Sequence, residues 1–113
     1  MNVKHMPAAI ALAAAFAYST LAAAASVTIT APSDGDTLDA MGSHRIHYQV
    51  DADPRGDHVH LYVDDREVAI LRDLKGSYPI ESLAPGKHTL CIKLVNRAHT
   101  PIGVEDCVRV TLK

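Results

Sequence analysis

Aromatic residues and clustered positive charge are scarce in this chain of 113 residues. It has no tryptophan, one phenylalanine and four tyrosines, so it offers few rings on which a base or a sugar can stack. Acidic residues outnumber basic ones by 13 to 11, and no stretch of lysine or arginine forms a basic stripe. Nucleic acids and anionic membrane surfaces attract such stripes, so we expect neither as a partner.

Sequence signatures of catalysis are missing as well. The chain has no Gly-x-Ser-x-Gly elbow for a nucleophilic serine and no glycine-rich loop that would cradle a phosphate. A chain of this length also has few places for a deep pocket. We therefore expect a protein that binds or supports other molecules, not an enzyme.

The N-terminal residues 1–25 have the pattern of a cleaved signal peptide. A short basic start at Lys4 precedes an apolar run at 8–21, and the four alanines at 22–25 fit the cleavage site. The apolar run is shorter than the roughly 20 residues that span a bilayer. We therefore expect a mature chain, 26–113, that is periplasmic or secreted and has no transmembrane segment.

The mature chain is long enough for one domain. Without Lys4 it has 10 basic and 13 acidic residues, a formal charge of −3. A domain this small buries only about 60% of the surface that its unfolded chain exposes, so a covalent cross-link would help it. Cys91 and Cys107 supply one, since an even number of cysteines in an exported protein indicates a disulfide.

Short segments of alternating apolar and polar residues follow one another along the mature chain, separated by turn residues. This pattern is typical of an all-β domain, and the mature chain has no sustained helical period. We expect seven strands, at 27–30, 44–50, 58–63, 67–71, 78–82, 87–95 and 105–112. Pro79 indicates that the fifth strand lies at a sheet edge.

The strand pattern and one corner resemble an immunoglobulin-like or fibronectin-III-like sandwich. In these folds a tyrosine, two residues before a buried position, bonds back to upstream backbone, and here His88 has that place before Leu90. The chain is also similar to small periplasmic proteins of this class, whose function is undefined, in the stretches 58–61, 85–90 and 99–101. The resemblance covers residues 27–112 and implies a seven-stranded antiparallel sandwich, but no particular function.

The two cysteines can be placed within this fold. If 87–95 and 105–112 form an antiparallel hairpin with its tip near 96–103, Cys91 lies directly opposite Cys107. The bridge then crosses the outer face of the sheet, where it would stabilise the fold by about 3 kcal/mol on chain-entropy grounds. A structural cross-link is one interpretation, and a redox-active pair is the alternative.

Histidine is the one compositional oddity, since six of the seven lie in the mature chain. His58 and His60 are two apart on one strand and therefore project side by side. In an immunoglobulin-like sandwich, the loop before this strand and the loop that holds His99 lie at the same end. His58, His60 and His99 can thus form a copper or zinc site. The alternative is that exposed strands simply carry histidines and that His99 caps a turn.

The other histidines and the acidic loop are weaker indications of a binding site. His44 and His47 are three apart on a strand of the other sheet, and we expect them at the surface. The loop with Asp51, Asp53 and Asp57 allows a loose calcium site or a solvated turn, although it does not fit an EF-hand. The sequence favours an exported module that recognises a protein or cell-envelope partner, with periplasmic metal binding as the alternative. It gives no oligomeric state.

Overall fold

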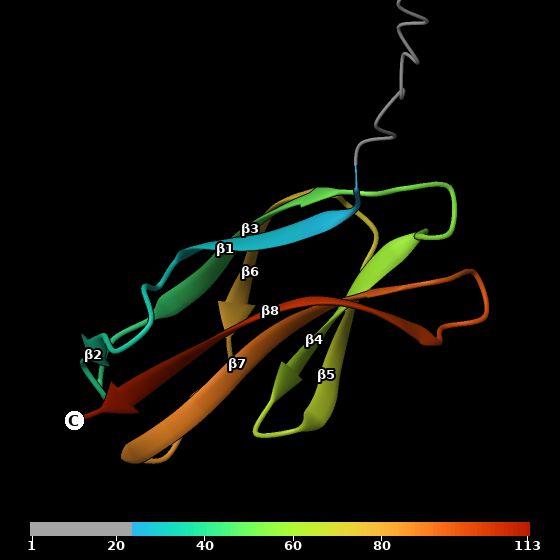
Figure 1. Ribbon diagram of the computed structural model, residues 1–113. Helices are drawn as coiled ribbons and strands as arrows, with labels where there is room; N and C mark the ends of the chain where they lie inside the picture. The colour runs from blue at the N-terminus through green and yellow to red at the C-terminus, as the bar shows by residue number, and fades with distance from the viewer. Residues whose placement is uncertain (1–23) are drawn as a thin grey trace, which may run out of the picture.

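The computed structural model describes residues 24–113, so all but two residues of the predicted signal peptide, 1–25, lie outside the described part. Eight strands and no helix occur in this part (Figure 1). They are β1 Ser26–Ala31, β2 Thr37–Leu38, β3 His44–Asp51, β4 His58–Val63, β5 Arg66–Leu71, β6 Lys75–Ile80, β7 Gly86–Val95 and β8 Pro101–Leu112. Among residues 24–113, therefore, no helix is long and apolar enough to cross a bilayer.

The strands form two sheets around one core, which confirms the all-β, immunoglobulin-like sandwich. One sheet has the order β1-β3-β6 and the other the order β2-β8-β7-β4-β5 (Figure 1). Neighbouring strands are antiparallel except for β2 and β8, which are parallel. The seven-strand prediction misses β2, because two residues are too few to show an alternating pattern.

Two strand boundaries differ from the prediction by more than two residues. Lys75 and Gly76, expected in a turn, belong to β6, because they pair with Gln49 and Tyr48 of β3. Strand β8 begins several residues earlier than predicted, since the hairpin that it forms with β7 has a tight tip. Strand β6 lies at the edge of its sheet, as Pro79 indicates.

The core lies between the inner faces of the two sheets. On β3, buried and exposed residues alternate, so that Ile46, Tyr48 and Val50 point inward. Leu90, Ile92 and the other large aliphatic side chains of the core each stabilise the fold by about 1.5–3 kcal/mol when fully buried. Strand β4 departs from this alternation, because its residues 58–61 are buried on both faces.

The disulfide joins Cys91 of β7 to Cys107 of β8, directly opposite in the hairpin register, as the sequence predicts. Leu90 and Ile92, its neighbours on β7, are fully buried in the core. The bridge therefore lies on the outer face of the five-stranded sheet.

His88 holds the corner that leads into β7. Its Nε2 lies 2.7 Å from the carbonyl oxygen of Ala84, and its Nδ1 lies 2.6 Å from Oδ2 of Asp64. Because both partners are acceptors, both ring nitrogens donate, and only the charged imidazolium can do so. The hydrogen bond to Asp64, followed by the one to Ala84, accordingly raises the pKa of His88.

Candidate metal centre

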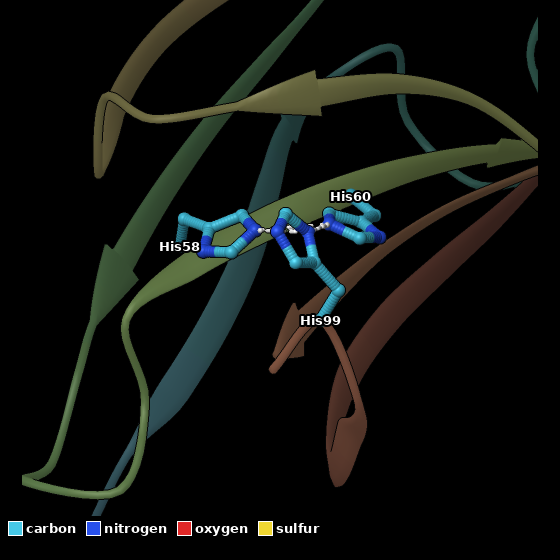
Figure 2. Close-up of side chains that lie close together, drawn as sticks. All are labelled: His58, His60 and His99. Carbon is cyan, nitrogen blue, oxygen red and sulfur yellow. Dashed lines mark hydrogen bonds between the residues drawn. The ribbon is translucent and has the colours of Figure 1, made fainter. Parts of the chain in front are cut away.

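The structure brings His58, His60 and His99 together on the outer face of the five-stranded sheet. His58 and His60 project from β4, whereas His99 reaches over them from the loop between β7 and β8 (Figure 2). The loops before β4 and after β7 lie at the same end of the sandwich (Figure 1), where the Asp57 amide donates to the carbonyl of Val95. Only 1% of His58 and 2% of His60 is exposed, while His99 is exposed.

Three ring nitrogens form a nearly equilateral triangle. Nε2 of His58 lies 3.0 Å from Nε2 of His60, and each of these atoms lies 3.1 Å from Nδ1 of His99. A hydrogen bond needs a proton on one nitrogen and a lone pair on the other. Since each corner holds either a proton or a lone pair, at most two of the three sides can be hydrogen bonds. On the remaining side, two lone pairs or two protons face each other.

Two carboxylates determine which tautomer the buried histidines adopt. Oδ2 of Asp57 lies 2.8 Å from Nδ1 of His58, and Oε1 of Glu67 lies 2.8 Å from Nδ1 of His60. The second contact is close but lacks hydrogen-bond geometry, so Nδ1 of His60 has no hydrogen-bond partner. A carboxylate only accepts, so it favours the proton on Nδ1 and leaves the lone pair on Nε2. Both Nε2 lone pairs then point into the triangle, as they do in metal sites supported by outer carboxylates.

The charges around the cluster favour this arrangement. The hydrogen bond with His58, and the charges of Arg97 and Arg72, lower the pKa of Asp57 and keep it anionic. Burial lowers the pKa of His60, although the nearby Glu67 carboxylate opposes this effect. The imidazole of His60 therefore remains neutral, with a lone pair available for a metal, at lower pH than an exposed histidine does.

The size of the triangle fits a transition-metal ion. Bonds from zinc to histidine nitrogen are about 2.0–2.1 Å long, which at tetrahedral angles puts the nitrogens about 3.3–3.4 Å apart. The sides of the triangle therefore need to lengthen by only about 0.3 Å. Imidazole nitrogens suit zinc and copper in particular.

The loop holds His99 in place through Asn96. Oδ1 of Asn96 accepts hydrogen bonds from the amides of Ala98 at 2.9 Å and Thr100 at 3.0 Å. The carbonyl of Asn96 also accepts from the amide of His99, which has a left-handed backbone with φ of 63°. These bonds fix the backbone that carries the third ligand.

Sequence reasoning missed the supporting residues of this site. Asp57 was considered only for calcium, and Glu67 and Asn96 were not singled out. An acidic residue directly before His58 was a usable signal, because metal-bound histidines commonly donate to a carboxylate. The role of Glu67 depends on the pairing of β4 with β5, which spacing along the chain does not show.

The remaining candidates do not join the site. His44 contacts the carbonyl of Asp39 at 2.7 Å, and it lies with His47 on β3 in the other sheet. Asp53 binds Arg55, and within residues 24–113 the acidic residues of the loop before β4 form no metal-sized group, so the calcium interpretation has no support. A second group, formed by the two cysteines and Glu105, holds its sulfurs in the disulfide.

Comparisons with known proteins show the fold of the chain. A solved structure of the fibronectin(III)-like modules of Clostridium thermocellum CbhA matches with a TM-score of 0.64 and 19% identity, covering 77% of this chain and 96% of that one. No protein-family model matches the chain, and no curated protein matches it. The chain therefore has the fold of a fibronectin(III)-like module.

Proposed function

We propose that this domain binds a copper or zinc ion through Nε2 of His58, Nε2 of His60 and Nδ1 of His99. The observation that carries the proposal is the triangle of nitrogens with sides of 3.0–3.1 Å, two of whose corners present lone pairs. A metal ion accepts a lone pair from each of the three nitrogens at once, and so removes the contact between like groups that hydrogen bonds leave on one side of the triangle.

The ligand set favours copper over zinc. Divalent copper binds more tightly than divalent zinc to a given set of nitrogen ligands, because it stands higher in the order of affinities for first-row metals. Zinc nevertheless fits the three-nitrogen arrangement, with one position left over. We expect both ions to bind, with copper the tighter.

The proposal puts this site in the periplasm or outside the cell. The disulfide between Cys91 and Cys107 supports an exported protein, since such bonds persist in oxidising compartments. The signal-peptide pattern of residues 1–25 agrees with this, and it leaves 26–113 as a single-domain module. A small exported module with a three-histidine site fits the handling of metal ions in the cell envelope and needs no catalytic residue.

Calorimetric titration of the purified protein with Cu²⁺ and Zn²⁺ at neutral pH tests the proposal. The double variant His58→Ala/His60→Ala is compared with the control His44→Ala/His47→Ala, which removes two histidines of the other sheet. We expect one ion per chain at micromolar or tighter affinity in the wild type and the control, and none in the test variant. Flat heats in the wild type, or equal binding by both variants, would contradict the proposed metal site.

A second function, recognition of a protein partner, is favoured by strand β5. This strand ends the five-stranded sheet, and Val68 and Ile70 on it are 47% and 49% exposed. The free edge of such a strand can pair with an extended segment of another protein. Pull-down from a cell-envelope extract, with Val68→Lys/Ile70→Lys as the comparison, tests this. A partner that the wild type and this variant retain equally would exclude the β5 edge as its binding surface.

A further inference from the structure

The three-histidine cluster is one donor short of the four that a tetrahedral ion requires. We propose that the bound ion keeps its fourth position for a small exogenous anion, so that the site binds an anionic ligand through its metal. This inference rests on the metal site proposed above and names what that site takes as its ligand.

No further histidine, cysteine, aspartate or glutamate in the described part of the chain supplies the fourth donor. The metal-sized group at the site consists of the three histidines alone. The two nearest carboxylates, of Asp57 and Glu67, lie against the Nδ1 atoms of His58 and His60. In an imidazole, Nδ1 and Nε2 face away from each other, so a carboxylate at Nδ1 cannot also reach an ion at Nε2.

The geometry of the triangle leaves one side of the ion free. An ion about 2.0–2.1 Å from three nitrogens that are about 3.1 Å apart lies about 1 Å out of their plane. The three ligands then all lie to one side of the ion, as in zinc sites that keep a position for water or substrate. An additional ligand approaches from the other side without displacing a histidine.

The exposed side of the cluster is the loop end of the sandwich. His99 and its neighbours Ala98 and Thr100 are exposed, although His58 and His60 beneath are not. A shallow, mainly polar hollow lies between the loop before β4 and the loop after β7, at residues that flank His58 and His99 in the chain. Its lining includes Gly56, Asp57, Asn96, Arg97 and Ala98. Ligands of a few atoms fit this approach better than large ones.

The charge around the ion favours an anion over a neutral ligand. Arg72 and Arg97 each have a guanidinium nitrogen 3.7 Å from a carboxylate oxygen of Asp57, so the formal charges of these two residues, Asp57 and Glu67 add up to zero. Three neutral imidazoles leave the charge of a divalent ion uncompensated. An ion in this state lowers the pKa of its bound water and attracts anions that compete with that water.

The test uses the purified protein loaded with Co²⁺, whose visible spectrum reports the number and kind of its ligands. Azide and acetate are titrated in, with perchlorate, which coordinates weakly, as the control at equal ionic strength. The variant His47→Ala is the matched control, since it lacks a histidine of the other sheet. Sedimentation before and after loading shows whether the chain remains a monomer.

We expect a saturable change in the Co²⁺ spectrum with azide and acetate, none with perchlorate, the same response in His47→Ala, and a monomer throughout. Uptake of Co²⁺ with a spectrum indifferent to azide and acetate would overturn the inference and leave the metal site standing. A dimer that forms on loading would likewise overturn it, because a second copy then supplies the fourth donor. If Co²⁺, Zn²⁺ and Cu²⁺ all fail to bind, the proposed function fails and this inference fails with it.

Discussion

His99→Ala separates metal binding from folding better than any other change at the site. His99 is exposed and lies in a loop, so its removal leaves no cavity in the core. His58 and His60 are buried, and truncating them changes the packing of the sheet as well as the ligand set. Substitutions of exposed residues usually change stability by less than about 0.5 kcal/mol. We therefore expect the metal-free variant to unfold at nearly the wild-type temperature.

The metal response, in contrast, depends on His99. An ion present at 100 times its dissociation constant stabilises the folded wild type by about 2.7 kcal/mol. Losing one of three ligands weakens affinity by about 100-fold or more, at the upper end of what the loss of a supporting residue costs. At the same metal concentration, the stabilisation of the variant is then about 0.4 kcal/mol.

Thermal unfolding followed by far-ultraviolet circular dichroism measures this difference. For a domain of this size, 1 kcal/mol corresponds to about 4–8 °C in Tm. The shift in Tm caused by Zn²⁺ should therefore fall from about 11–22 °C in the wild type to about 2–3 °C in His99→Ala. A variant that keeps the full Zn²⁺ shift would refute the assignment of His99 as a ligand. A large loss of Tm without metal would refute the argument that His99 has little structural role.

Four further changes test other parts of the argument. Asp57→Ala should weaken Zn²⁺ binding about 10–100-fold in calorimetry, because His58 loses the carboxylate that fixes its tautomer. Asn96→Ala should weaken binding by up to about 30-fold in the same assay, since two amide hydrogen bonds that hold the loop are lost at about 1 kcal/mol each. Reducing the disulfide, or replacing both cysteines with serine, should lower the free energy of urea unfolding by about 3 kcal/mol, and no change would contradict its role as a cross-link. At the corner, the raised pKa of His88 contributes stability that is fully present below its unperturbed value of about 6.5 and is lost as the pH rises through the folded value. The stability difference between the wild type and His88→Gln in urea should therefore shrink above that pH, and a difference that grows would show that the sign is wrong.

The carboxylate of Asp64 sets the other limit of this pH window. Burial alone would raise the pKa of Asp64, but hydrogen bonds from His88 and from the amide of Thr89 outweigh it and lower the pKa. Its contribution is therefore present above the unperturbed value of an aspartate and is lost as the pH falls through the lowered one. The contact between His88 and Asp64 stabilises the corner most between these two pH limits, where both side chains are charged.

The alternation of apolar and polar residues was enough to predict the strands that turn one face toward the core. The bounds of β4 match the prediction, because Val59 and Leu61 mark the inner face unambiguously. Strand β6 was misplaced because Lys75 and Gly76 have the composition of a turn, and only their pairing with β3 makes them a strand. The early start of β8 depends on the tight loop around Asn96, which is a matter of side-chain hydrogen bonds and not of periodicity.

The three histidines of the site could be grouped from the sequence, but their environment could not. Spacing by two on a strand and the common end of two loops are properties of any such sandwich, and they predict proximity. The burial of His58 and His60 follows from how the β7–β8 loop folds over the outer face, which no local pattern encodes. The contact of Glu67 with His60 requires the irregular register of β4 and β5 near Tyr62.

The burial of these two imidazoles is itself an argument for a ligand. Burying an imidazole costs free energy unless its nitrogens have partners, and His58 and His60 are almost fully buried. Within the triangle, at least one side must remain unbonded, because three nitrogens cannot alternate between donor and acceptor around a ring of three. Aliphatic residues would pack on this face without this cost. Three ring nitrogens that one ion would bind together, and that cannot all pair with one another, make sense as a binding site and not as a device for stabilising the sheet.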